Sequence, residues 1–382
     1  MDNLCDFNNQ NTNAGLTLLD SGKIAFPRIL SAIQNAKQSV KINMFIWRAD
    51  NIGLKIANAV LESANRGVKV EISVDRYGFV LELAEESMLS FFHQKPTFAE
   101  RVKVATLKII YSTKRVEFLD AQKAVELRDL ILSHPNIKVE RKTFKADHSK
   151  YYLIDNSLLF VGGINIEDKE NGADYIGRVY QDYMVEIADN RTIDRFLAKI
   201  EGKNTQGYPC FFANLKRKDN LFEMRKAYLD IIKNAKKELT IVMAYISPLK
   251  DFMDEIVSAY NRGVKITLLI PERANFQSDL NLKTVRKILK QTNNNIDVYL
   301  SPKMVHTKLV LSENVISLGS TNINKKAMNQ LDEINLFVEN CDSQFTNDLY
   351  QSVGENINIS KKVKTKEIKY NKFIAFMEGF LM

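Results

Sequence analysis

The chain has 382 residues, which is long enough for two domains or for one large duplicated domain. Its composition, with 45% hydrophobic and 26% charged residues, indicates an ordinary folded core and excludes a largely disordered protein. The net charge of +8 favours anionic partners, such as phospholipid head groups or nucleic acid, without choosing between them.

The cysteines and the apolar runs bear on where the protein acts. Cys5, Cys210 and Cys341 fit neither a disulfide framework nor a zinc site, which favours a reducing cytoplasm. The first fifteen residues are polar and rich in asparagine, so we expect no secretory signal. No apolar run reaches about 18 residues, so we expect no transmembrane helix and only peripheral contact with a membrane.

One sequence pattern occurs twice, in residues 29–76 and 228–273. Each copy has an amphipathic helix ending in Asn-Ala-Lys, an apolar run, a second helix ending in Asn-Arg-Gly-Val-Lys, and another apolar run. Gly67 and Gly263 stand where a glycine commonly ends a helix. Apolar runs that alternate with helices predict buried parallel strands, here at residues 40–47, 68–74, 239–246 and 264–270. The fold class is therefore α/β, with two halves that each contain a mostly parallel or mixed sheet flanked by helices.

The repeat also suggests domain boundaries. We expect a first half at residues 1–205, with a largely helical and charged insert at about 78–134, and a second half at 221–360. Residues 202–220 contain Gly207, Pro209 and a charged run, and are interpreted as a linker. In the tail, residues 361–382, lysines precede clustered Phe, Met and Leu. Either this segment packs on the core as a helix with solvated lysines, or it lies in a membrane interface.

Two His-x-Lys motifs occupy equivalent places in the repeat, His148-Ser149-Lys150 and His306-Thr307-Lys308. Each opens an apolar run that is followed, after a short polar turn, by a second run, as is typical of a β-hairpin. Alternate residues of a strand point to the same side, so the histidine and lysine of each motif project together. After the hairpins come Gly162-Gly163-Ile164-Asn165 and Gly319-Ser320-Thr321-Asn322, in which glycine permits close backbone approach and asparagine offers an amide donor.

These residue types suit phosphoryl transfer. A unit charge about 4 Å from a phosphodiester is worth roughly 4 kcal/mol at an effective dielectric of 20, so two lysines can stabilise its transition state. A histidine, with a free pKa of about 6.5, can attack as neutral imidazole or donate a proton as imidazolium. A single motif would be compatible with a surface histidine, whereas two matched motifs inside a repeat favour catalysis. For the other two histidines, His93 and His134, we expect surface roles.

The paired motifs resemble the HKD signature of the phospholipase D superfamily, and the resemblance extends from about residue 16 to about residue 351. It is closest to bacterial cardiolipin synthases that lack N-terminal membrane spans. The supporting stretches are residues 18–22, 45–47, 161–166, 181–185, 319–322 and 333–335. The resemblance implies a duplicated phospholipase D fold, in which two halves related by a pseudo-twofold axis share one site.

The resemblance also implies a role for each residue. His148 would be the nucleophile, and His306 the general acid and then the base. The phosphate would be bound by the lysines and amides of both motifs, with the residues after the first glycines beside them: Lys150, Lys308, Asn165, Asn322, Gly163 and Ser320. Asp182 and Glu333 would each orient the histidine of the opposite half, and Asp155 would complete the first HKD motif as a catalytic-site residue. No metal and no cofactor are implied.

The second motif departs from the signature. Glu313, rather than an aspartate, stands seven residues after His306, and the second hairpin is one residue shorter than the first. Glu313 and Ser312 are the candidates to replace the missing aspartate, whose role in the family is mainly structural.

The function implied is phosphatidyl transfer from phosphatidylglycerol, or a related phospholipid, to an alcohol through a phosphohistidine, as in a cardiolipin synthase. The alternatives are a phospholipase D that uses water, a nuclease of the same superfamily, and a binding or scaffolding protein with a degraded second motif. The expected partners are an anionic phospholipid and the membrane surface, reached from the cytoplasm at the inner face of the cell membrane. Nucleic acid is disfavoured because most aromatic residues fall within apolar runs. The oligomeric state is left open.

Overall fold

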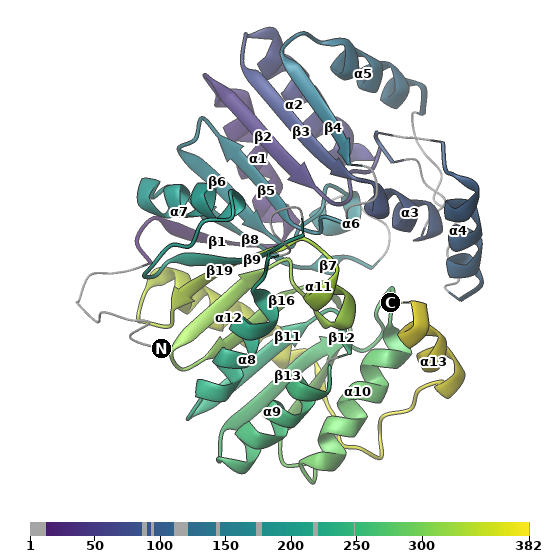
Figure 1. Ribbon diagram of the computed structural model, residues 1–382, viewed down its shortest axis with the longest axis vertical. Helices are drawn as coiled ribbons and strands as arrows, with labels where there is room; N and C mark the ends of the chain where they lie inside the picture. The colour runs from purple at the N-terminus through teal and green to yellow at the C-terminus, as the bar shows by residue number, and fades with distance from the viewer. Residues whose placement is uncertain are drawn as a thin grey trace.

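Two large β-sheets, with helices packed on them, make up most of the protein (Figure 1). The computed structural model describes residues 13–85, 90–92, 95–110, 121–142, 146–172, 178–216, 221–247 and 249–381. None of the helices formed by these residues combines the length and the apolar character of a membrane-spanning segment.

The first sheet has seven strands in the order β1-β8-β6-β5-β2-β3-β4. Its strands are β1 (Leu16–Asp20), β2 (Ser39–Met44), β3 (Lys69–Asp75), β4 (Ile137–Lys142), β5 (Lys150–Ile154), β6 (Leu158–Gly162) and β8 (Tyr183–Ile187). The helices that accompany it are α1 (Gly22–Asn35), α2 (Asn51–Asn65), α5 (Ala121–Ser133) and α7 (Asn190–Ile200).

The second sheet has nine strands in the order β10-β9-β19-β17-β16-β11-β13-β14-β20. Without the short edge strands β10 and β20, this order corresponds strand for strand to that of the first sheet, which confirms the duplication. The strands are β9 (Cys210–Leu215), β10 (Leu221–Phe222), β11 (Glu238–Met243), β13 (Lys265–Pro271), β14 (Asp297–Ser301), β16 (Lys308–Ser312), β17 (Val315–Gly319), β19 (Glu333–Glu339) and β20 (Lys361–Lys362). The accompanying helices are α8 (Met224–Asn234), α9 (Lys250–Asn261), α10 (Ser278–Gln291) and α12 (Gln344–Asn358).

The strand pairing follows the expected pattern in both halves. β2, β3 and β4 are parallel, as are β11, β13 and β14. The pairs β5–β6 and β16–β17 are the predicted antiparallel hairpins. Gly67 and Gly263 follow the ends of α2 and α9 with φ of +96° and +86°, a conformation that glycine adopts without strain.

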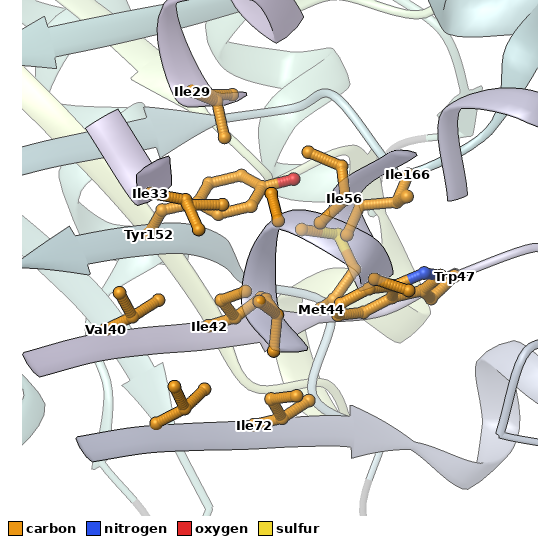
Figure 2. Close-up of a cluster of buried hydrophobic side chains, with 14 of the residues drawn as sticks. Ile29, Ile33, Val40, Ile42, Met44, Trp47, Ile56, Ile72, Tyr152 and Ile166 are labelled. Carbon is orange, nitrogen blue, oxygen red and sulfur yellow. The ribbon is translucent and has the colours of Figure 1, made fainter. Parts of the chain in front are cut away.

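Buried side chains form three layers of core. Helices α1 and α2 pack on the outer face of the first sheet through the cluster in Figure 2, which includes Ile29, Ile42 and Ile56. A matching cluster lies under α8, α9 and α10 on the second sheet. Between the two sheets, apolar residues of β5, β6 and β8 pack with those of β16, β17 and β19. The two halves therefore share a core, which fixes the position of one relative to the other.

The insert predicted in the first half is largely helical in its described residues. Helix α5 connects β3 to β4 as α10 connects β13 to β14, and its Ala124, Leu127 and Ile131 belong to the outer core. Helix α5 is therefore part of the repeat. Among the described residues of the insert predicted at about 78–134, the helices without a counterpart in the second half are α3 (Arg76–Glu85) and α4 (Phe98–Ile110).

Two other segments differ from, or refine, the predictions. Residues 202–220 are not simply a linker, because β9 lies within them and pairs with β19, and its Cys210 is buried. In the tail, β20 pairs with β14, and helix α13 (Lys372–Leu381) packs against α10. The tail thus packs on the second half through β20 and through one face of α13.

Candidate active site

Each histidine motif is held in place by the opposite half. Strands β15 (Met304–Val305) and β7 (Tyr180–Gln181) pair in parallel, and the N–H of His306 donates to the carbonyl of Gln181 at 2.7 Å. In the equivalent contact, the N–H of His148 donates to the carbonyl of Asp332 at 2.8 Å. Gln181 and Asp332 each precede a carboxylate residue, so the two backbone contacts bring these carboxylates under the histidines.

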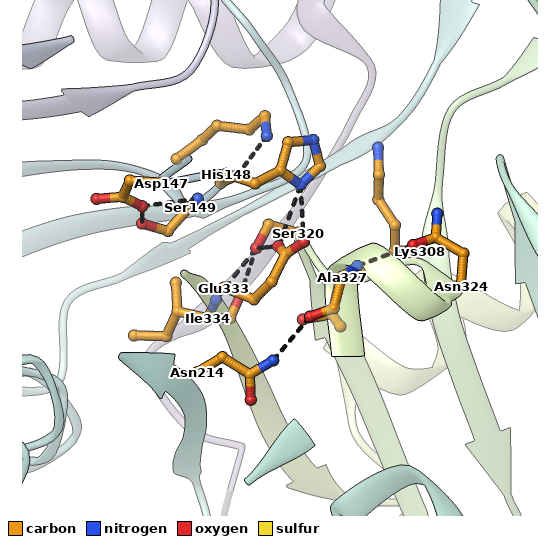
Figure 3. A network of polar contacts seen from close by, with 12 residues as sticks. Asp147, His148, Ser149, Asn214, Lys308, Ser320, Asn324, Ala327, Glu333 and Ile334 are labelled. Atoms are coloured by element: carbon orange, nitrogen blue, oxygen red, sulfur yellow. Dashed lines mark hydrogen bonds and ion pairs between the residues drawn. The ribbon is translucent and has the colours of Figure 1, made fainter. Parts of the chain in front are cut away.

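The carboxylates pair with the histidines across the two halves. Glu333 lies 3.1 Å from Nδ1 of His148, and Asp182 lies 2.9 Å from Nδ1 of His306. These are the contacts that the resemblance implied. In Figure 3, Nδ1 of His148 points toward Glu333, and the other ring nitrogen lies on the opposite edge of the ring. Because Nδ1 is engaged in both rings, Nε2 is the nitrogen available to a substrate.

Gly163 and Ser320 support these carboxylates. A Cβ on Gly163 would lie 2.2 Å from Oδ2 of Asp182, so only glycine leaves room for that carboxylate. At the equivalent position, the hydroxyl of Ser320 donates to Oε2 of Glu333. The phosphate-binding role expected of these two residues stays a prediction; the structure adds that the Ser320 hydroxyl contacts Glu333 and that the absence of a side chain at Gly163 leaves room for Asp182.

The two motif lysines are fully buried. Lys150 donates to the carbonyl of His148 at 2.5 Å, and Lys308 donates to Oδ2 of Asp182 at 3.1 Å. Burial and the nearby charge of Lys308 lower the pKa of Lys150 to about 7. Two buried ammonium groups that repel each other favour the binding of an anion between them, because the anion offsets both charges.

Asn165 and Asn322 face the same space. Both are buried and line a cavity of about 70 Å³ together with His148 and His306. Among the described residues, the carboxamide oxygen of each has no hydrogen-bond partner. A buried carboxamide oxygen without a donor is costly, so each of these side chains is suited to accept a hydrogen bond from a substrate hydroxyl, while its NH2 group can donate to a phosphate oxygen.

Aromatic rings form the walls of this cavity. Phe45 packs edge-on against the His148 ring with 4.6 Å between centroids, and Tyr180 and Tyr245 lie 5.4 and 6.1 Å from the His306 ring. Such walls exclude water and strengthen the electrostatic interactions inside.

The electrostatic surroundings of the two histidines differ. Burial, Lys150 and Lys308 lower the pKa of His148 well below its ordinary value, so this ring stays neutral near pH 7. Burial also raises the pKa of Glu333 well above its ordinary range. Burial opposes the ionisation of Asp182, but Lys308 and His306 outweigh it and hold the pKa of this carboxyl below its usual value. His148 is therefore in the neutral form that a nucleophile requires, whereas His306 lies beside the ionised carboxylate of Asp182.

Glu170 is a second carboxylate near His306 that the sequence analysis missed. It lies in α6 (Asp168–Asn171), and its Oε1 is 3.3 Å from Nδ1 of His306. The repeat gives no signal for it, because the equivalent residue after Asn322 is Ala327. Burial raises the pKa of Glu170. A positive charge on His306 thus faces two acidic groups, whereas His148 contacts one.

Asp155 lies away from the reacting groups. It occupies the turn at the far end of β5 from Lys150, and its carboxylate accepts the backbone N–H groups of Lys37, Gln38 and Ser39 at 2.7–2.9 Å. We therefore correct its assignment to the catalytic set: its contacts hold the start of β2.

Glu313 makes the equivalent contacts in the second half. Its carboxylate accepts the N–H of Lys236 at 2.7 Å and that of Glu238 at 3.3 Å, at the start of β11. The longer glutamate side chain thus compensates for the shorter hairpin, and Glu313, rather than Ser312, replaces the missing aspartate.

Glu170, Asp182 and His306 have ligand atoms within 4.8 Å of one another, a spacing that could hold a metal ion. However, the ammonium of Lys308 lies 3.1 Å from Oδ2 of Asp182 and 3.0 Å from Nδ1 of His306. A cation supplied by the chain already occupies this position, so catalysis without a metal stays our prediction.

The remaining histidines are separate from the site or not described. His134 lies in the turn before β4 and contacts Asn65, as expected of a surface residue. His93 lies outside the described residues.

The sequence matches one protein family along both halves. The family described as "Cardiolipin synthase, PLD-like domain" matches residues 29–202 and 228–353. Cardiolipin synthase 2 of Staphylococcus epidermidis is 23% identical over 96% of this chain and 73% of its own length. Cardiolipin synthase B of Shigella flexneri is 25% identical over 67% of this chain and 59% of its own length.

Solved structures share the fold. Phosphatidylserine synthase of Haemophilus influenzae superposes with a TM-score of 0.71 at 15% identity, covering 95% of this chain and 92% of its own. Polyphosphate kinase of Porphyromonas gingivalis superposes with a TM-score of 0.58 at 12% identity, covering 96% of this chain and 53% of its own. At these identities the likeness concerns the fold alone.

Proposed function

The chain belongs to the phospholipase D-like domain family of cardiolipin synthases, which makes it an enzyme of the phospholipase D superfamily, and we propose that it transfers a phosphatidyl group through a phosphohistidine on His148. The donor is an anionic phospholipid, phosphatidylglycerol in the first place. The acceptor is the hydroxyl of a second phosphatidylglycerol, and the products are cardiolipin and glycerol.

One observation supports this chemistry above the others. Two histidines with different electrostatic surroundings face one cavity together with Asn165 and Asn322. The two buried motif lysines lie directly beside these histidines, Lys150 on the carbonyl of His148 and Lys308 at 3.0 Å from Nδ1 of His306. A phosphodiester placed there would offset the lysine charges and accept hydrogen bonds from the NH2 groups of the two asparagines. Each half contributes one histidine, one lysine and one asparagine, so both halves are needed to complete the site.

In the first step, Nε2 of His148 attacks the phosphorus and the bond from phosphorus to the glycerol oxygen breaks. His306, as imidazolium, gives its Nε2 proton to that oxygen, and glycerol leaves. Glu333 accepts the Nδ1–H of His148 and holds the ring with Nε2 toward the phosphorus. Asp182 and Glu170 stabilise the imidazolium of His306 before the transfer.

In the second step, the neutral His306 takes the proton of the acceptor hydroxyl. The acceptor oxygen attacks the phosphorus, and the bond from phosphorus to Nε2 of His148 breaks. Both histidines return to their starting states. If water entered instead of the lipid hydroxyl, the product would be phosphatidic acid, which is the reaction of the hydrolytic alternative.

The protein surface supports a lipid substrate over nucleic acid. Helix α13 presents Phe373, Phe376 and Phe380 to solvent, with exposed fractions of 71%, 66% and 82%. Exposed lysines lie in the segment just before this helix, including Lys366 and Lys369. Apolar side chains next to basic ones suit an anionic membrane surface. We therefore propose peripheral attachment to the inner face of the cell membrane.

The proposal is tested by incubating the purified protein with phosphatidylglycerol vesicles and following the lipids by mass spectrometry. Cardiolipin and free glycerol should form together, and His148→Ala should form neither. Single- and double-stranded DNA are incubated at the same enzyme concentration. DNA cleavage that His148→Ala abolishes, without any lipid product, would instead identify a nuclease. Phosphatidic acid as the sole lipid product would identify a phospholipase.

A further inference from the structure

Two helices expose large apolar side chains that the core does not use. On α13, Phe373, Phe376 and Phe380 follow the spacing of one helix face, while Ala375 and Glu378 on the other face are buried against α10. On α4, Phe98 and Val102 are one turn apart and have exposed fractions of 83% and 51%. Apolar side chains at this exposure, grouped on helix faces, mark an interaction surface.

The two helices come from different halves and lie along the same edge of the molecule in Figure 1, α4 in blue and α13 in yellow. Neither is required by the repeat: α4 belongs to the insert of the first half, and α13 follows the last repeated element. Each half thus contributes one additional helix with an outward apolar face.

The inner side of α4 lines a cavity that adjoins the catalytic one. This cavity, of about 400 Å³, is lined by Thr97, Glu100 and Lys103 of the α4 region, and it shares Tyr77, Lys326 and Leu331 with the catalytic cavity. Helix α13 likewise lines a cavity that adjoins the catalytic cavity, on the side of the second half. Its Ile374 and Glu378 line a cavity of about 700 Å³ that shares Asn275 with the catalytic cavity.

The charge around α4 suits an anionic partner. Lys103 and Lys326 lie over the ring of Tyr77, at 4.2 and 3.8 Å from its centroid, and within the described parts of the chain neither forms an ion pair with a carboxylate. The nearby Glu100 instead forms an ion pair with Arg76, with 2.7 Å between its Oε1 and Nε of the arginine. On the α13 side, Lys366, Lys369 and Lys372 are exposed.

We infer that α4 and α13 form a two-helix membrane-docking surface that inserts Phe98, Val102, Phe373, Phe376 and Phe380 into an anionic bilayer, with the catalytic cavity between them. The occupant is a lipid surface because the outward faces are apolar and the flanking groups are cationic. Docking at both sides would place the catalytic cavity over the head groups from which it draws its substrates. This inference rests on the proposed function, because it assumes that the substrate is a membrane lipid.

The first experiment compares vesicle binding and activity in matched variants. Phe373→Ser/Phe376→Ser/Phe380→Ser and Phe98→Ser/Val102→Ser are compared with Leu130→Ser and Ile359→Ser, which replace exposed apolar residues of α5 and of the end of α12. On vesicles rich in phosphatidylglycerol, the triple variant should bind about a hundredfold or more weakly, since each tenfold corresponds to about 1.4 kcal/mol. The two controls should bind as the parent protein does.

Activity on soluble short-chain phosphatidylglycerol separates the two proposals. The docking variants should convert this monomeric lipid at the parent rate while losing activity on vesicles. If the parent protein converts neither form of the lipid, the proposed function fails. If the parent converts both and the docking variants keep vesicle binding and vesicle activity, the docking surface is wrong.

The second experiment uses tryptophan as a depth reporter. Trp47 is the single tryptophan of the chain and is buried, so it provides a constant background. Phe98→Trp and Phe376→Trp should each show a blue-shifted emission on anionic vesicles and quenching by brominated acyl chains, and Leu130→Trp should show neither. Quenching at only one of the two helices, or at Leu130→Trp as strongly as at the helices, would overturn a docking surface made by α4 and α13 together.

Discussion

Gly163 offers the sharpest test of how the site is assembled. Substitution by alanine adds one methyl group, whose carbon would lie 2.2 and 2.5 Å from the two carboxylate oxygens of Asp182. These distances are far below van der Waals contact, so the carboxylate must move by about 1 Å, and a misplacement of that size can cost about 10²-fold in rate. The displaced group is the one that contacts both His306 and Lys308.

We therefore predict that Gly163→Ala lowers kcat for cardiolipin formation by about a hundredfold, because the proton donor and one phosphate-binding lysine lose their common partner. Gly163→Ser should be at least as damaging, although serine is the residue at the equivalent position of the second half. The measurement is initial-rate kinetics on short-chain phosphatidylglycerol, with thermal unfolding of each variant measured alongside to confirm that the protein is folded.

The matched control is Ser320→Ala, where a Cβ is already accommodated. This change removes only the hydroxyl that donates to Glu333 and should lower kcat by about tenfold. If Gly163→Ala stays within about threefold of the parent rate while remaining folded, Asp182 does not need its present position, and the orienting role assigned to it is wrong.

The other predictions concern metal, pH and the two hairpin turns. Activity should survive excess EDTA, because Lys308 provides the cation between Asp182 and His306; loss of activity restored by a divalent ion would contradict this. In a pH profile, kcat/KM should fall above about pH 7, because Lys150 loses its charge there. On the acid side, kcat/KM should fall only below about 6.5, the pKa of a free histidine, because the pKa of His148 is lowered. A profile that rises through pH 8 would refute these assignments. Asp155→Asn and Glu313→Gln should each lower the free energy of unfolding by about 1–2 kcal/mol in denaturant titrations and leave kcat nearly unchanged, and a loss of kcat as large as that of Lys308→Ala would show that these turns act in the chemistry.

The repeat made most of the fold predictable. Matching helices, apolar runs and terminal glycines indicated two equivalent sheets, and the two hairpins followed from the runs after His148 and His306. Strand β9 was not predicted, because Cys210-Phe211-Phe212 is a short apolar run between Pro209 and a charged stretch. Such a composition is typical of a linker. Helix α5 was included in the insert because residues 77–134 are far longer than their counterpart, residues 274–294, although α5 has the same place in the crossover as α10.

The site was predictable where a residue had a counterpart in the other half. The two motifs, both asparagines and the cross-half carboxylates all follow this rule. Glu170 could not be found in this way, because its counterpart is Ala327. Asp155 was misassigned because a motif gives spacing along the chain, whereas only the strand register shows that the turn lies at the opposite end of β5 from Lys150.

The exposed phenylalanines of α13 illustrate another limit. Apolar residues in a helical segment are normally expected to face the core, and the sequence does not show which face of a terminal helix packs. The structure buries Ala375 and Glu378 and leaves Phe373, Phe376 and Phe380 outside.

The covalent intermediate is the centre of the account, and trapping it is the most direct test. The enzyme is denatured during turnover of phosphatidylglycerol labelled in the phosphate, and the labelled peptide is identified by mass spectrometry. The account predicts an acid-labile label on His148, and none on the chain in His148→Ala. A label that persists in His148→Ala, or that maps to His306, would contradict the assignment of the nucleophile.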